Sequence, residues 1–115
     1  MKNCDIFKKY HKAVENADEV GMRQLLAPDA HIWYNFKHTS YDESEAPEDL
    51  IRTNLAIVQN SEIFRHIYDL PCWDTPDGFV VQATCHNKTL KGSEARFPIC
   101  FVGTIDNQQR ISSYK

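Results

Sequence analysis

The feature that most restricts the fold of this chain is a change in the period of its apolar residues near position 60. Before this point they recur every three or four positions, as on one face of a helix: Phe7, Tyr10, His11 and Val14. After it the period is two, in segments rich in β-branched and aromatic residues: 63–74, 78–90, 94–105 and 110–114. Helices followed by strands with short connections predict an α+β fold, a meandering antiparallel sheet with helices packed on one face.

Two further elements are predicted between the first helix and the strands. Asp18 is a suitable N-cap for a short second helix, whose apolar face would hold Met22, Leu25 and Leu26. The stretch APDA at 27–30 should end this helix, because proline cannot continue the hydrogen-bond ladder. The next stretch, HIWYNFKH at 31–38, alternates as a strand does.

A third helix is predicted after a polar, acidic loop at 37–46. Pro47 suits its first turn, and the acidic residues that follow suit its positively polarised end. Its buried face would consist of Ile51, Leu55 and Val58. Turn sequences at 75–78 (TPDG) and 91–94 (KGSE) separate the later strands.

Length and charge exclude several classes of protein. A chain of 115 residues is expected to form one domain over 1–115 with a single core. A net charge of −3 gives no general attraction to nucleic acid or to anionic membranes, and no apolar run reaches the roughly 20 residues of a membrane span. We therefore expect a cytoplasmic protein that binds neither nucleic acid nor membrane.

The cysteines and histidines give no sign of a disulfide framework or of a metal site. The four cysteines contain no C-x-x-C pair, and they lie at no ligand-like spacing from the five histidines. Reduced thiols and no bound metal or cofactor are therefore expected.

Two long stretches resemble a known superfamily. The segments FKKYHKAVENADEVGMRQLLAPDAHIW and ICFVGTIDNQQRISSYK resemble the NTF2-like superfamily, in particular its SnoaL-like and ketosteroid-isomerase-like branch. The resemblance implies a cystatin-like cone, in which three helices from the N-terminal half pack on a strongly curved mixed or antiparallel sheet. It also implies an apolar pocket at the open end of the cone and a homodimer formed through the sheet.

The same resemblance allows the ketosteroid-isomerase chemistry to be tested residue by residue. Tyr10 falls on the family's hydrogen-bond donor in the first helix, but the position of the catalytic base falls on Tyr34, whose ordinary pKa near 10 is unsuitable. The second donor would lie near Cys100 or Phe101, where no carboxylate occurs between Glu94 and Asp106. That reaction is not expected. Epoxide hydrolases of the superfamily use an Asp-Arg-Asp set, which Arg65, Asp69 and Arg96 do not match in spacing.

The resemblance also suggests which side chains line the pocket. The predicted pocket set is Tyr10, Ile32, Tyr34, Asn35, Phe36, His38, Phe97, Cys100 and Phe101. Tyr10 and His38 are the catalytic candidates, because a phenol can donate a hydrogen bond and an imidazole can act as a general base near pH 7.

Strand alternation adds a prediction about orientation. It places Trp33 on the face opposite Ile32, against the helices or a dimer partner. His66 and His86 are predicted on the sheet surface, and Cys100 is predicted to be a small buried hydrophobe.

Three readings of the function remain open. The first is a domain that binds a small, mostly apolar or aromatic molecule, and that could be an isomerase-, hydrolase- or cyclase-type enzyme. The second is a non-catalytic dimerising interaction module whose cavity is collapsed or filled by its own side chains. A subunit of a larger oxygenase-like complex is a third reading, which an additional exposed apolar face would support. The cavity volume separates the first two, because ligand pockets hold roughly 300 Å³ or more.

Overall fold

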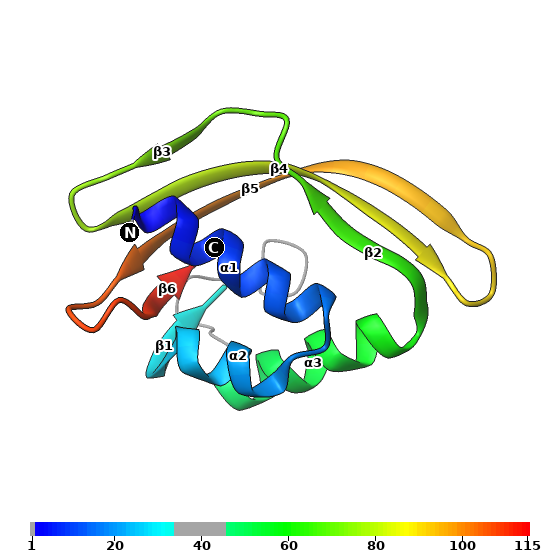
Figure 1. Ribbon diagram of the computed structural model, residues 1–115, viewed down its shortest axis with the longest axis horizontal. Coiled ribbons are helices and arrows are strands. Elements are labelled where there is room, and N and C mark those ends of the chain that lie inside the picture. The colour runs from blue at the N-terminus through cyan, green and yellow to red at the C-terminus, as the bar shows by residue number, and fades with distance from the viewer. Residues whose placement is uncertain (1, 34–45) are drawn as a thin grey trace.

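The computed structural model describes residues 2–33 and 46–115. Within these residues three helices pack against one sheet (Figure 1). The helices are α1 (Asn3–Glu15), α2 (Glu19–Leu25) and α3 (Pro47–Gln59). The strands are β1 (Leu26–Ile32), β2 (Ser61–Ile67), β3 (Cys72–Asp74), β4 (Gly78–Thr89), β5 (Glu94–Ile105) and β6 (Ile111–Tyr114).

The sheet is mixed and strongly curved. Its strand order is β1-β6-β5-β4-β2, and β3 pairs with β4 on the edge that β2 also uses. β1 runs parallel to β6, whereas the other pairs are antiparallel. The long β4–β5 hairpin arches over the helices, and α1 lies against the concave face (Figure 1). The predicted α+β cone with helices on one face is therefore confirmed.

The core lies between α1 and the concave face of the sheet. Phe7 is fully buried, and its ring stacks on Phe79 of β4 with ring centroids 4.5 Å apart. Tyr10, His11 and Val14 are buried on the same face, as the helical period predicts. Burial of this apolar face against the sheet is what holds α1 in place.

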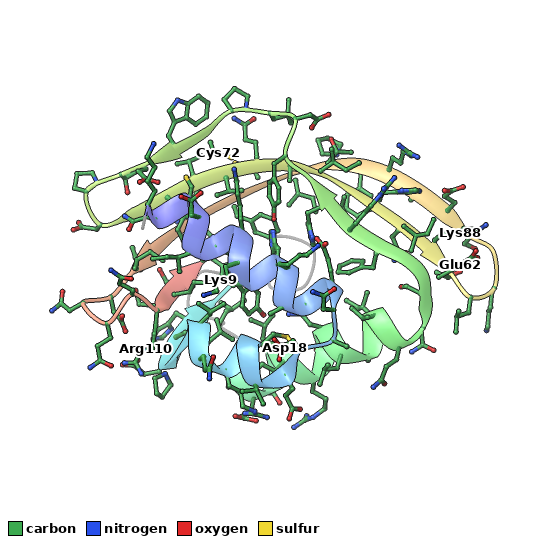
Figure 2. The ribbon with its side chains drawn as sticks, viewed as in Figure 1. Lys9, Asp18, Glu62, Cys72, Lys88 and Arg110 are labelled. Carbon is green, nitrogen blue, oxygen red and sulfur yellow. The ribbon has the colours of Figure 1, made fainter. Side chains whose placement is uncertain are left out.

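The boundary between α2 and β1 differs from the prediction. Asp18 caps α2 as expected, accepting a hydrogen bond from the backbone nitrogen of Gly21 at 2.9 Å (Figure 2). The helix ends at Leu25, however, and Leu26 already pairs with Ile111 of β6. Pro28 is accommodated because β1 is an edge strand whose register shifts between Leu26 and His31. The strand predicted at 31–38 thus begins earlier, and its residues from 34 onward lie outside the described part of the chain.

Helix α3 begins at Pro47, as predicted. Leu50 and Ile51 are buried, whereas Leu55 and Val58 are only partly buried against the core. The outer half of this helix therefore faces a less tightly packed region than its first turns.

The segment predicted as one strand at 63–74 is two strands. β2 ends at Ile67, and the chain then crosses to β3, which pairs with the beginning of β4. An ion pair of 3.4 Å between Glu62 and Lys88 joins β2 to β4 at their far end (Figure 2). Both strands therefore use the same partner, β4, at different positions along its length.

The register of the hairpin decides which side chains face the helices. Val81 and Cys85 of β4 are buried, and they pair with Phe101 and Phe97 of β5. Because paired residues point to the same face, Phe97 and Phe101 also face the helices, and alternation adds Ile99. This row of β5 forms one wall of the interior.

Candidate functional site

A cavity of about 580 Å³ lies between the helices and the inner face of the sheet. Its walls come from α1, α3, β2, β4, β5 and β6. Most of the lining is apolar and includes Val14, Ile57, Phe64, Cys85, Phe97 and Phe101. The space lies where the second half of α3 faces the β4–β5 hairpin. In this half of the helix Leu55 and Val58 are only partly buried against the core.

Several polar side chains interrupt the apolar lining: Thr53, Tyr114 and Lys115, and two pairs whose contacts are described next. The first joins α1 to α3: the side-chain amide of Asn54 donates a hydrogen bond of 2.7 Å to the hydroxyl oxygen of Tyr10. Tyr10 is 1% exposed, so its hydroxyl is held deep in the structure. Because Asn54 holds the hydroxyl of Tyr10 in one position, this phenol can orient a ligand without first being ordered itself.

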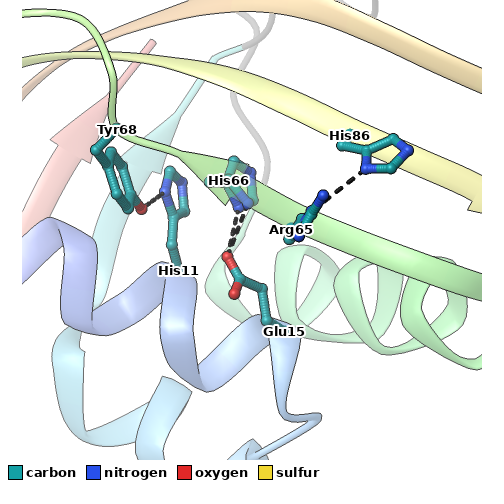
Figure 3. Close-up of polar contacts among 6 residues, drawn as sticks. All are labelled: His11, Glu15, Arg65, His66, Tyr68 and His86. Carbon is teal, nitrogen blue, oxygen red and sulfur yellow. Dashed lines mark hydrogen bonds and ion pairs between the residues drawn. The ribbon is translucent and has the colours of Figure 1, made fainter.

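The second polar group is a stacked pair of histidines. The rings of His11 on α1 and His66 on β2 lie parallel, with centroids 3.8 Å apart and an interplanar angle of 10°. Both side chains line the cavity, and Figure 3 shows His11 rising from α1 and His66 from β2. His11 Nδ1 is 2.6 Å from the hydroxyl oxygen of Tyr68, and the other ring is held by Glu15.

Glu15 contacts His66 twice from the last turn of α1. Its Oε2 accepts a hydrogen bond from the backbone nitrogen of His66 at 2.9 Å and lies 3.1 Å from Nδ1 of the same residue. The side chain of Glu15 is 16% exposed and that of His66 is 5% exposed. The pair is thus a carboxylate–imidazole dyad at the edge of the cavity.

The pKa values follow from this arrangement. Burial opposes ionisation of Glu15, but the side-chain and backbone hydrogen bonds from His66 outweigh it, and the pKa of Glu15 lies below its usual value. Burial lowers the pKa of His11 well below its usual value, and the adjacent His66 adds to the effect. Burial also raises the pKa of Tyr68, which keeps its proton. At neutral pH the site therefore holds a carboxylate, a phenol and a neutral His11.

His86 shows a different arrangement on the opposite face of the sheet. Its Nε2 lies 2.6 Å from Glu94 Oε2, and its Nδ1 accepts a hydrogen bond of 3.3 Å from Nε of Arg65 (Figure 3). The prediction that His66 and His86 are surface residues is therefore wrong. His66 is covered by α1, and His86, 2% exposed, is enclosed by the charged side chains around it.

The predicted pocket residues fall into three groups. Tyr10, Phe97, Cys100 and Phe101 line the cavity. Ile32 is fully buried in the core and does not line it. Tyr34, Asn35, Phe36 and His38 lie outside the described residues. That any of these side chains binds a ligand stays a prediction.

Two further predictions about the pocket are wrong. Trp33 lines the cavity instead of facing away from it, because β1 ends at Ile32 and strand alternation does not extend to the next residue. Cys100 is exposed rather than buried, although the residue also borders the cavity. Of the epoxide-hydrolase residue types, Arg65 and Arg96 both pair with His86 across the strands, and Asp69 accepts a hydrogen bond of 3.4 Å from Thr84.

The histidine pair was missed by the sequence analysis. One signal was present: an imidazole at position 11 on an otherwise apolar helix face, with a carboxylate four residues later on the same face. The partner strand could not be identified, because Glu15 and His66 are 51 residues apart in sequence. Among the described residues no three His, Cys, Asp or Glu side chains converge as metal ligands, and no helix is long and apolar enough to cross a membrane.

Comparison with known proteins identifies the fold. No protein-family model and no curated protein matches the chain. Among solved structures, an NTF2-like protein of unknown function from Burkholderia pseudomallei is 17% identical, with a TM-score of 0.76 over 99% of this chain and 88% of the other. A candidate polyketide cyclase from Pseudomonas putida is 16% identical, with a TM-score of 0.78 over 99% and 89%.

A third structure was solved with a ligand. It is a hypothetical protein with a ketosteroid-isomerase-like fold from Catenulispora acidiphila, in complex with trimethylamine. It is 11% identical, with a TM-score of 0.76 over 95% of this chain and 81% of the other. The chain therefore has the NTF2-like fold, and the resemblance to the SnoaL-like and ketosteroid-isomerase-like branch is confirmed at the level of fold.

Proposed function

We propose that this protein binds a small, mostly apolar or aromatic molecule in the cavity between α1, α3 and the sheet. The observation that carries the proposal is the cavity itself. Its volume of about 580 Å³ exceeds the roughly 300 Å³ at the lower end of ligand pockets, and its lining is mainly apolar with a few buried polar groups. This volume favours a ligand-binding cavity over a collapsed or self-filled interior.

The lining indicates which features the ligand should have. Phe97 and Phe101 offer aromatic faces, which favour flat or ring-containing molecules. The Tyr10–Asn54 pair and the two histidines would each contact a polar substituent. The trimethylamine complex of the Catenulispora acidiphila protein supports the idea that this fold accommodates small molecules.

If the protein is an enzyme, we propose acid–base chemistry of the isomerase, hydrolase or cyclase type, without a cofactor. The ketosteroid-isomerase mechanism itself is not proposed, because β5 provides no carboxylate at positions 95–105. The acid–base groups would instead come from α1 and β2, where Glu15, His11 and His66 meet.

We also propose that the protein forms a homodimer through the outer face of the sheet. Trp73, Val80 and Val102 pair in register across β3, β4 and β5. Trp73 is 52% exposed and Val102 is 41% exposed, so this row presents apolar surface away from the helices. The same face would serve the alternative function, a non-catalytic interaction module.

A thermal-shift screen tests the ligand proposal. Steroids, aromatic acids, terpenoid epoxides and polyketide-like quinones are added to the purified protein, and binding to the native state should raise its melting temperature. For a ligand found in this way, Phe97→Ser should weaken binding about 10-fold or more, since a phenyl side chain that the ligand covers contributes about 1.5–3 kcal/mol.

Val102→Ser is the matched control. Phe97 and Val102 are both on β5 and similarly exposed, at 43% and 41%, but only Phe97 lines the cavity. The control should leave the dissociation constant unchanged. A screen in which no class stabilises the protein, or equal losses in the two variants, would contradict the proposal.

A further inference from the structure

We propose that His11 and His66 form a proton-transfer pair that acts on the ligand of the cavity, with Glu15 and Tyr68 as positioning residues that fix the two tautomers. The inference rests on the proposed function, because it requires a ligand in the same cavity. It assigns an acceptor nitrogen to His66 and a donor nitrogen to His11.

The tautomer of His66 follows from the groups around Glu15. An ionised carboxylate can only accept hydrogen bonds, so the ring nitrogen that faces Glu15 Oε2, Nδ1, must carry a hydrogen. In the neutral ring Nε2 then keeps its lone pair. Nε2 has no hydrogen-bond partner among the described residues, and the side chain is 5% exposed. His66 therefore presents an acceptor within the lining of the cavity that no described residue satisfies.

The tautomer of His11 follows from Tyr68. The phenol keeps its proton, and its only hydrogen-bond partner in the described part of the chain is His11 Nδ1, at 2.6 Å. Donation from the phenol to Nδ1 satisfies both groups and leaves the ring hydrogen of His11 on Nε2. This N–H also has no partner within the described ranges, although His11 is 5% exposed.

Two buried ring nitrogens that have no partner among residues 2–33 and 46–115 are unusual at one cavity. Buried polar groups in folded proteins are nearly always hydrogen-bonded, because leaving water without a new partner is costly. His86 obeys this rule, since both of its nitrogens have partners. The stacked pair departs from it at the place where a ligand would supply the missing acceptor and donor.

The pair can carry out a balanced proton transfer. The lone pair of His66 Nε2 takes a proton from an acidic C–H or O–H bond of the ligand, and the electron pair of that bond remains on the ligand. Where this pair moves to an oxygen, Nε2–H of His11 donates a hydrogen bond to the oxyanion. The imidazolium formed at His66 is stabilised by the Glu15 carboxylate. Return of the proton to a different ligand atom completes the cycle and consumes no co-reactant.

An acceptor nitrogen on His66 and a donor nitrogen on His11 restrict the class of ligand. The pair suits an aromatic or ring-containing molecule with an acidic C–H or O–H group close to an oxygen that can accept a hydrogen bond. An amine or a simple hydrocarbon would satisfy at most one of the two nitrogens.

The tautomers can be measured without a ligand. Long-range ¹H–¹⁵N NMR spectra of the whole protein at pH 7 should show His66 with its proton on Nδ1 and His11 with its proton on Nε2. In Glu15→Gln the preference of His66 for Nδ1–H should weaken, and in Glu15→Asp it should be largely restored. A His66 ring with its proton on Nε2 in the unmodified protein would overturn the inference.

Catalysis can be measured with 5-nitrobenzisoxazole, a small aromatic probe. Removal of its C3 proton by a base forms a nitrile as the ring N–O bond breaks, and the released phenolate oxygen can accept a hydrogen bond. His66→Gln should lower kcat/KM on the order of 100-fold, the usual effect of losing a general base. His86→Gln is the matched control on the opposite face, and its kcat/KM should change less than about twofold, within the spread expected for a residue with no acid–base role.

Binding of 5-nitroindole, an analogue of similar shape without the reactive N–O bond, separates the two proposals. Binding together with the expected loss in His66→Gln supports both of them. Binding with equal rates in the protein and in His66→Gln overturns the proton-transfer pair and leaves the proposed function intact. Absence of binding overturns the aromatic ligand class and the proton transfer that depends on it. If His66→Gln does not fold, as judged by circular dichroism, Glu15→Gln takes its place and should lower kcat rather than raise KM.

Discussion

Glu15 lies in the last turn of α1, where its carboxylate meets a histidine 51 residues further along the chain. The sequence predicts that Tyr10 and His11 face the interior, because both follow the helical period. It does not predict what His11 meets there, since the contact depends on how the end of α1 docks on β2. The helical period of the sequence shows which side chains of α1 face the interior. Which residues they contact there depends on how segments distant in sequence pack together.

We expect the stability contributed by Glu15 to depend on pH. Its pKa in the folded protein lies below the ordinary value of 4.5, so its contribution is fully present above 4.5 and is lost as the pH falls through the lower folded value. At pH 7, Glu15→Gln should lower the free energy of unfolding by about 1 kcal/mol, the usual net worth of such a hydrogen bond. Urea unfolding between pH 7 and pH 3 should show the two proteins converging in stability.

Glu62→Gln is the control for this experiment. Glu62 faces a cation, Lys88, and its side chain is 58% exposed. Exposed ion pairs contribute little, and this variant should differ from the unmodified protein by less than about 0.5 kcal/mol. A gap between Glu15→Gln and the unmodified protein that widens toward pH 3 would refute the assignment.

At the level of elements, the N-terminus of α1 is capped by a residue from another strand. Lys2, at the N-cap position, makes no side-chain cap. Asp74 of β3 supplies it, accepting from the backbone nitrogens of Cys4 at 2.8 Å and Asn3 at 3.2 Å. These hydrogen bonds lower the pKa of Asp74. The small strand β3 is thus tied to the helix that carries Tyr10 and His11.

Removing this cap should destabilise the protein. Asp74→Ala leaves two helix N–H groups without their acceptor, and we expect a loss of about 1 kcal/mol in the free energy of unfolding. Asp77→Ala, three residues later in an exposed turn, should cost less than half as much. Equal melting temperatures for Asp74→Ala and the unmodified protein would show that solvent replaces the cap.

Element boundaries were predictable where local chemistry decides them. Pro47 marks the start of α3, and the turn sequences mark the ends of the β4–β5 hairpin. The beginning of β1 was not predictable in this way. Leu26 continues the apolar period of α2, but its pairing with Ile111 of β6 places it in the strand instead of the helix. The split between β2 and β3 was missed for the same reason: both parts alternate, and only the position of β4 separates them.

For the whole molecule, the order of helices and strands was sufficient to predict an α+β fold with helices on one face of a sheet. The curved cone was implied by the resemblance, and the parallel pairing of β1 with β6 differs from the antiparallel sheet that the order predicts. The cavity was expected from the resemblance, but its volume and polar groups depend on how far α3 and β5 stand from each other, which no local pattern encodes. Tyr10 was predicted to line the pocket, and its side chain does line the cavity. The stacked pair of His11 and His66 could be identified only from the three-dimensional structure.

The proposed dimer can be tested by its mass in solution. Sedimentation equilibrium should give about twice the chain mass of 13.3 kDa, and Val102→Glu should shift the protein toward the monomer, because a buried unpaired carboxylate is costly. Val20→Glu is the control, since Val20 is 65% exposed on α2, in the helix layer. A monomer mass for the unmodified protein at high concentration would exclude this interface.

The pairing of β2 with β4 has one more consequence, for how such proteins diversify. Arg65 and His66 are adjacent, yet one points away from the cavity and the other lines it. Their register is set by an irregularity between Ser61 and Ile63. Because a shift of one residue exchanges the two faces of a strand, inserting a single codon there would move Arg65 to the place of His66 and so replace the imidazole in the cavity with a guanidinium. A lineage could thus turn a neutral binding wall into an anion-binding one in a single genetic event, while the rest of the scaffold stayed unaltered.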